Sequence, residues 1–255
     1  MPTPSSSKTG ARNPAADVKA ALAWLERHGS AANRAGMARY GIVAPKVFGV
    51  SVVNIRRLGK ELGTRHDLVE PLWASGWYEA RMLVAFIGDP AAVTPAQMDR
   101  WCREFDNWAI CDTLAFALFD RTPHAWTKVD QWARRRSEFE KRASFALLAS
   151  LAVHAKDTPD APFLERLPLI AEAATDGRNF VKKAVSWALR ATGHRSPVLH
   201  DAAMAMARRL ADAAGAPERW VGKDALRDLR RPLVAKRVAA NQARAEALTA
   251  RRSRR

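Results

Sequence analysis

The chain has 255 residues, of which 48% are hydrophobic, so it is long enough to bury a large core and most of it should fold. Its formal net charge is +16. Residues 236–255 hold seven Lys or Arg against one Glu, which leaves +10 on residues 1–235 and indicates a polyanionic partner such as nucleic acid, with a solubilising surface as the alternative.

The first 16 residues are rich in Ser and Pro and lack an apolar segment, so we expect a disordered segment over 1–16 and no secretory signal. From residue 17 onward, abundant Ala, few Gly or Pro and helical spacing of apolar residues predict helices with short breaks. No segment shows the sustained alternation of a half-buried strand, so the fold is predicted to be all-α.

Breaks containing Gly, Ser or Pro separate the predicted helices, and Ser51 and Thr94 are placed to cap two of them. The helices are expected at Asp17–His28, after Ser30, and at Val52–Leu62, His66–Ala74, Trp77–Ile87, Pro95–Glu104, Asn107–Phe119, His124–Arg134, Glu138–Val153, Pro162–Ala173, Arg178–Ala191, Pro197–Ala213 and Pro217–Leu229. We expect a single domain over 17–235. The basic tail at 236–255 is most simply disordered at its Arg-rich end, where it adds nonspecific affinity for DNA.

A weak internal repeat places an aromatic residue near the start of four predicted helices. Tyr78, Trp108, Phe139 and Phe180 are separated by 30, 31 and 41 residues, periods that suit a HEAT-like α-solenoid of antiparallel helix pairs. In three of the four repeats a cation follows three residues later, namely Arg81, Arg142 and Lys183. Every second helix of such a solenoid would line one concave wall and make it basic. Coincidence among Arg-rich helices is the alternative.

Asp112 is the first candidate for chemistry. It lies inside an otherwise uncharged run from Trp108 to Phe119, and its i, i+4 spacing places it on the same helix face as Trp108. A carboxylate in this setting is a helix cap for a neighbour, the partner of a buried Arg, or a working group. The sequence alone leaves these three readings open.

Trp187 is the second candidate. Lys183 precedes it by four residues and Arg190 follows it by three, so one helix face carries an indole between two cations. That arrangement suits a surface that faces phosphate and sugar. The alternative is a core Trp whose neighbours extend their charged ends into solvent.

At these residues the chain resembles the AlkD-type DNA alkylation-repair glycosylases, a family with HEAT-like repeats. The main matching pieces are Trp108-x3-Asp112, Lys141-Arg142-Ala143 and Phe180-Val181-x-Lys183-Ala184-x2-Trp187-x-Leu189-Arg190. Supporting pieces are Met37-Ala38-Arg39-Tyr40, Phe48-Gly49-Val50 and Trp220-Val221-Gly222-Lys223-Asp224-Ala225-Leu226. Together they span about residues 20–235, and their order and context make the resemblance fairly specific.

The resemblance implies a two-layer α-solenoid that cradles duplex DNA and hydrolyses the N-glycosidic bond of N3- and N7-alkylated purines without flipping the base. It implies that Asp112 is the catalytic carboxylate, that Trp108 and Trp187 contact the deoxyribose of the lesion, and that Arg142 holds the DNA backbone nearby. The cations Arg81, Lys183 and Arg190 are expected to bind further phosphates.

This chemistry suits those residue types. An alkylated purine leaves as a neutral base and needs no general acid, whereas the sugar becomes cationic and is stabilised by a carboxylate and by indole faces. Six histidines without metal-ligand spacing predict no metal, and no cofactor is expected. Two cysteines, Cys102 and Cys111, are too few for a disulfide framework and suit a reducing compartment.

We therefore expect a monomeric enzyme of the cytoplasm, associated with the nucleoid, whose partner is double-stranded DNA containing alkylated bases. No apolar run reaches the roughly 18 residues of a membrane-spanning helix, so no membrane partner is expected. Two alternatives stay open: a non-catalytic HEAT-like DNA-binding protein, and a HEAT scaffold for protein interactions.

Overall fold

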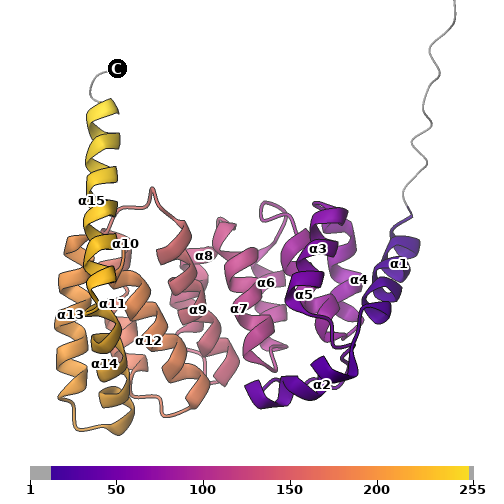
Figure 1. Cartoon of the computed structure of the whole chain (residues 1–255), viewed down its shortest axis with the longest axis horizontal. Helices are drawn as coiled ribbons and strands as arrows, with labels where there is room; N and C mark the ends of the chain where they lie inside the picture. Colours follow the sequence, from indigo (N-terminus) through magenta and orange to yellow (C-terminus); the bar gives the residue numbers. More distant parts are fainter. Residues whose placement is uncertain (1–12, 253–255) are drawn as a thin grey trace, which may run out of the picture. The chain divides into compact units, whose positions relative to one another are not determined.

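The computed structural model describes residues 13–252, and all the regular structure in that range is helical, which confirms the all-α prediction. The chain divides into two compact units, residues 1–89 and residues 90–255, where the sequence predicted one domain over 17–235. The bulk of the expected disordered segment 1–16 lies outside the described residues, but α1 already begins at Pro14 (Figure 1). Among the described residues, no helix combines the length and the apolar character needed to cross a membrane.

The first unit is a small helical cluster in which α5 is the most buried element. Its elements are α1 (Pro14–Arg27), α2 (Ala31–Met37), η1 (Ala38–Tyr40), α3 (Val52–Leu62), η2 (His66–Leu68), α4 (Val69–Ala74) and α5 (Tyr78–Ile87). Side-chain caps fix three of the helix starts, because Asn13, Ser30 and Ser51 each accept a hydrogen bond from an amide of the first turn. Helices α3 and α4 pack on α5.

A buried carboxylate fastens the long loop of the first unit. Glu79 of α5 is fully buried and accepts hydrogen bonds from three successive amides, those of Phe48, Gly49 and Val50, at 2.6–3.1 Å. Gly49 has a φ of +84°, and a Cβ at this position would lie 2.3 Å from the carbonyl oxygen of Ser30, so only glycine fits. Glu79 and Gly49 therefore hold the turn that precedes α3.

The second unit contains the rest of the helices. They are α6 (Pro95–Arg103), α7 (Trp108–Ala117), η3 (Phe119–Arg121), α8 (Ala125–Trp132), α9 (Glu138–His154), α10 (Ala161–Leu164), α11 (Leu167–Ala173), α12 (Asn179–Gly193), α13 (Pro197–Ala211), α14 (Ala216–Leu229) and α15 (Pro232–Arg252). Helix α9 packs against α7, α8 and α12, and α12 packs in turn against α13 and α14 (Figure 1). Residues on all sides of α9 are buried for this reason, including Phe145, Ala146, Leu147 and Leu148.

Two segments of the second unit differ from the sequence-based expectation. The predicted helix Pro162–Ala173 is divided into α10 and α11, because Pro168 has no amide hydrogen and its ring clashes with a carbonyl one turn earlier. The predicted tail at 236–255 is helical as far as Arg252. Val234 and Val238 are buried where α15 packs on α13 and α14, so the first turns of this helix are docked on the folded unit.

Candidate active site

The site is built on one face of α7. Asn107 caps this helix, with its side-chain oxygen accepting a hydrogen bond from the amide of Ile110 at 3.0 Å. Because the cap fixes the helix start at Trp108, steps of four residues bring Trp108, Asp112 and Phe116 onto a common stripe.

Asp112 is paired with Arg142 of α9 by two hydrogen bonds. The Nε of Arg142 donates to Oδ1 at 2.9 Å and its Nη2 donates to Oδ2 at 2.6 Å, the fork geometry of a strong carboxylate–guanidinium pair. The Nη1 of Arg142 donates to the carbonyl oxygen of Phe180 at 2.7 Å, which ties the pair to α12. Three helices therefore fix the position of this carboxylate.

The two side chains of this pair differ in their exposure to solvent. The Arg142 side chain is only 7% exposed, whereas that of Asp112 is 16% exposed. The sequence predicted that Arg142 holds the DNA backbone, but the structure directs its guanidinium inward, toward Asp112 and Phe180. In this arrangement Arg142 orients the carboxylate.

Burial and charge act in opposite directions on this pair. Burial raises the pKa of Asp112, and the charge and hydrogen bonds of Arg142 act to lower it. Burial also acts to lower the pKa of Arg142, but Asp112 outweighs it and the pKa of the guanidinium is raised. The protonated Arg142 therefore favours the ionised form of Asp112, against the effect of burial.

Aromatic rings flank the carboxylate along the stripe. Trp187 of α12 stacks on Phe116, with ring centroids 4.7 Å apart and planes within 4° of parallel. The rings of Trp108 and Phe180 each have their centroid 6.0 Å from the Cζ of Arg142. The indoles of Trp108 and Trp187 are both half-buried. The structure thus gathers Trp108, Asp112, Arg142 and Trp187 in one cluster, and their catalytic and binding roles remain predictions.

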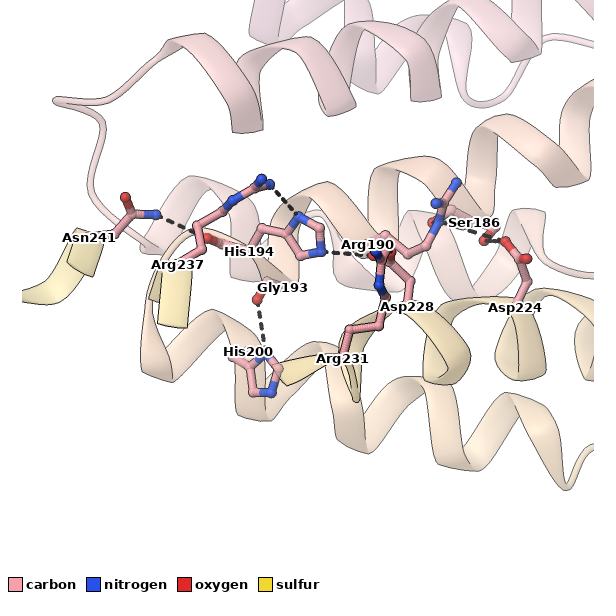
Figure 2. A network of polar contacts seen from close by, with 10 residues as sticks. All are labelled: Ser186, Arg190, Gly193, His194, His200, Asp224, Asp228, Arg231, Arg237 and Asn241. Atoms are coloured by element: carbon pink, nitrogen blue, oxygen red, sulfur yellow. Dashed lines mark hydrogen bonds and ion pairs between the residues drawn. The ribbon is translucent and has the colours of Figure 1, made fainter. Parts of the chain in front are cut away.

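The other predicted DNA-binding cations have different surroundings. Lys183 is exposed on α12. Arg190, on the same helix, lies 3.6 Å from the carboxylate of Asp224 on α14, which partly neutralises it (Figure 2). Arg81 belongs to the first unit, where its Cζ lies 4.8 Å from the ring centroid of Trp73. Contacts with phosphate by these three residues stay predictions.

A second carboxylate on the α7 side was not singled out from the sequence. The side chain of Asp120 in η3 is fully buried, and its Oδ2 accepts hydrogen bonds from Ser150 and from Nδ1 of His154, both at 2.5 Å. His154 is 49% exposed and meets Phe116 edge-on, with centroids 5.5 Å apart. The signal was present in the sequence, because Phe116 and Asp120 continue the four-residue steps from Asp112.

The described part of the chain contains no group of three or more His, Cys, Asp or Glu able to hold a metal ion. The cysteine beside the site is also unsuited to nucleophilic chemistry. Burial raises the pKa of the Cys111 thiol well above its ordinary value, so this thiol is protonated.

The helix pairs and their packing define a HEAT-like repeat protein. The sequence profile of the DNA alkylation repair enzyme family matches residues 21–229, and the chain therefore belongs to this family. The fold is also similar to a solved structure described as "A new family of proteins related to the HEAT-like repeat DNA glycosylases with affinity for branched DNA structures". That similarity has a TM-score of 0.67 and 21% sequence identity, and it covers 75% of this chain and 82% of the other. No curated protein matches the sequence.

Proposed function

We propose that the protein is a DNA glycosylase that hydrolyses the N-glycosidic bond of cationic N3- and N7-alkylated purines in duplex DNA, without flipping the base. The observation that carries this proposal is the setting of Asp112. Its carboxylate is held in a fixed orientation and is still partly exposed, on a helix face bordered by Trp108 and by the Phe116–Trp187 stack. Membership of the DNA alkylation repair enzyme family supports the same conclusion.

The reaction requires little help for the leaving group. An N3- or N7-alkylated purine is positively charged and departs as a neutral base, so no side chain has to protonate it. The remaining demand is at C1′ of the sugar, which becomes an oxocarbenium-like cation as the bond breaks. A preorganised negative charge near C1′ stabilises that state without further rearrangement.

Asp112 meets this demand in two ways. Its charge stabilises the sugar cation, and each carboxylate oxygen keeps a lone pair after accepting one hydrogen bond from Arg142, so it can orient the attacking water. The indole faces of Trp108 and Trp187 contribute cation–π attraction that grows as the sugar becomes positive. Arg142 is a positioning residue, because its two hydrogen bonds fix the orientation of the Asp112 carboxylate.

The test is base release from methylated duplex DNA, measured as free 3-methyladenine and 7-methylguanine. Replacing Asp112 by Asn removes the charge while keeping the shape, and release should fall by at least about 100-fold. Binding of the same duplex should persist, because the charge of the protein becomes more positive. Full release by the Asn variant would contradict the proposal. A neutral lesion such as hypoxanthine should be a poor substrate for the wild-type protein.

A non-catalytic DNA-binding protein is the second candidate, and one observation favours it. Arg142 engages both oxygens of Asp112, as a purely structural ion pair between helices would also do. The similar solved structure is described as having affinity for branched DNA. On this reading the wild-type protein binds DNA, prefers a branched junction to a linear duplex of equal length, and releases no methylated base.

A further inference from the structure

Helix α15 is an addition to the part of the chain that defines the family. The family match ends at residue 229, and α15 begins at Pro232. Its apolar side is buried through Val234 and Val238, whereas Lys236, Arg237 and Arg244 are exposed. At 1.5 Å per residue its 21 residues extend over about 30 Å. The helix therefore carries exposed cations, and its first part is docked through Val234 and Val238.

Polar contacts set the position of α15 against the end of α12. The side-chain amide of Asn241 donates to the carbonyl oxygens of His194 and Arg195, at 3.0 and 3.1 Å. Nη1 of Arg237 lies 3.3 Å from Nδ1 of His194, whose Nε2 is 2.8 Å from a carboxylate oxygen of Asp228 (Figure 2). Burial lowers the pKa of His194, so the neutral ring donates to Asp228 and accepts from Arg237.

The docking brings cations from three helix ends together. Arg195, after α12, donates to the carbonyl oxygens of Ala155 and Thr158, on either side of Lys156 at the end of α9. The pKa of Lys156 is lowered by burial and by the charges of Arg195, Arg237 and Arg244, as expected where like charges converge.

Little negative charge offsets this cluster. In the part of the chain that the structure describes, no carboxylate forms an ion pair with Lys156, Arg237 or Arg244. Asp157 follows Lys156 in the chain, and Asp160 acts on Arg195 from a distance while it accepts a hydrogen bond from Ser196. A surplus of unneutralised cations is what a polyanion recognises, and binding it relieves their mutual repulsion.

The cluster is connected to the candidate active site by direct contacts. Trp187 stacks on Phe116, Phe116 meets the half-exposed ring of His154, and the carbonyl oxygen of His154 accepts a hydrogen bond from the amide of Lys156 at 2.8 Å. These contacts form a continuous path from Trp187 on α12, through Phe116 on α7 and His154 on α9, to Lys156.

We propose that Lys156, Lys236, Arg237 and Arg244 form a phosphate-binding surface, the α15 surface, which holds the DNA backbone several nucleotides away from the lesion. The proposal rests on the proposed function in that DNA is the polyanion. The α15 surface goes beyond the proposed function, because its contacts lie largely outside the family-matched region and do not require catalysis. The α15 surface lengthens the footprint on DNA and adds no base-specific contact.

The test is a salt titration of binding to an undamaged 21-base-pair duplex. The double variant Lys156→Gln with Arg244→Gln removes two exposed charges while keeping the Arg237 and Asn241 contacts that dock the helix. Loss of two phosphate contacts should reduce the slope of log affinity against log salt by about 1.8 and weaken binding more than tenfold at about 0.1 M salt. Wild-type circular dichroism and melting temperature should be retained.

The matched control is Arg208→Gln with Arg209→Gln, which removes the same charge from the exposed side of α13. Its slope should stay within about 0.5 of the wild-type value. Equal slopes for the two double variants would overturn the α15 surface, as would a wild-type slope in the Lys156/Arg244 variant. Because the duplex is undamaged, a protein that releases no methylated base still gives a decisive answer, so the two proposals fail separately.

A second arm of the experiment uses an 8-base-pair duplex, which we expect to be too short to reach the α15 surface from the candidate site. The Lys156/Arg244 variant should bind this duplex nearly as well as the wild type.

Discussion

In the second unit, two buried cations, Lys128 and Arg142, each pair with an Asp about 30 residues earlier in the chain, and the two pairs behave differently. Asp99 of α6 accepts a hydrogen bond from Lys128 at 2.7 Å and another from the indole nitrogen of Trp132 at 2.8 Å. Asp112 accepts both of its hydrogen bonds from Arg142 alone. One pair joins α6 with α8 and the other joins α7 with α9, so the fold alone does not distinguish a structural carboxylate from a catalytic one.

The surroundings of the two carboxylates make the difference. Trp132 is fully buried and turns its N–H toward Asp99, and this bond together with Lys128 lowers the pKa of Asp99 in spite of its burial. For Asp112 burial prevails and the pKa is raised. The rings next to Asp112 along α7 are half-buried. An ion pair with fixed geometry and open aromatic neighbours is the combination that suggests chemistry.

The largest effect on the free energy of unfolding is expected when the cation of each pair, Arg142 or Lys128, is replaced. Arg142→Met leaves a buried carboxylate unpaired and should lower the free energy of unfolding by about 3–5 kcal/mol. Lys128→Met leaves Asp99 the indole donor and partial exposure, so about 1–3 kcal/mol is expected. Urea unfolding of both variants gives the comparison. If Arg142→Met lowers the free energy of unfolding by less than Lys128→Met does, Asp112 is better solvated than its burial indicates.

Replacing the carboxylates separates function from structure. Asp112→Asn should reduce base release from methylated DNA by at least about 100-fold, equivalent to about 2.7 kcal/mol of transition-state stabilisation. Asp99→Asn should lower stability while keeping release within a few-fold of wild type in protein that remains folded. Single-turnover release assays at saturating protein concentration make the measurement independent of binding affinity. Equal losses in the two variants would reduce Asp112 to a structural carboxylate.

These pairs also show which features of the site a local sequence pattern predicts. Helix α3 was predicted with its observed bounds, because Ser51 caps one end and Gly63, with a φ of +66°, ends the other. The site residues Trp108 and Asp112 were recognised because their spacing is local. The bond from Arg142 to Asp112 depends on the relative rotation of two packed helices, which no local pattern specifies, and a buried Arg partner was left as one alternative.

The segment 236–252 was interpreted as part of a tail for a related reason. Its charge is that of a disordered tail, and the two valines that dock it acquire meaning only once α13 and α14 provide a surface. The division of the predicted helix at Pro168 was, in contrast, visible in the sequence. Local rules therefore predicted the elements well, whereas pairing between elements required the structure.

The indole of Trp187 should have an intermediate effect. Trp187→Ala removes one cation–π contact and the ring stacked on Phe116, so base release should fall by about 2- to 30-fold, corresponding to 0.5–2 kcal/mol. The matched control is Trp126→Ala, another half-buried indole of the second unit, which contacts Phe163 and Arg166. The control should keep wild-type release. A larger loss in Trp126→Ala would indicate that release follows stability in general.

The smallest expected effect, and the most direct contrast between the two carboxylates, is in the pH dependence of stability. The pKa of Asp99 is lowered by folding, so its ionised form stabilises the protein above the ordinary value near 3.8, and this contribution is lost as the pH falls further. The pKa of Asp112 is raised by folding, so its contribution has the opposite sign: folding is favoured by protonation, and stability is gained as the pH falls toward 3.8 from above.

Each Asn variant removes one of these contributions, so the difference in unfolding free energy between variant and wild type should change with pH in opposite directions. For Asp112→Asn the change should occur above pH 3.8, and for Asp99→Asn below it, as measured by urea unfolding between pH 3 and 7. Base release by the wild type should decline over the higher of these two ranges, because protonation of Asp112 removes the charge that the sugar cation requires. If release declines only in the lower range, Arg142 controls the ionisation of Asp112 more strongly than burial does.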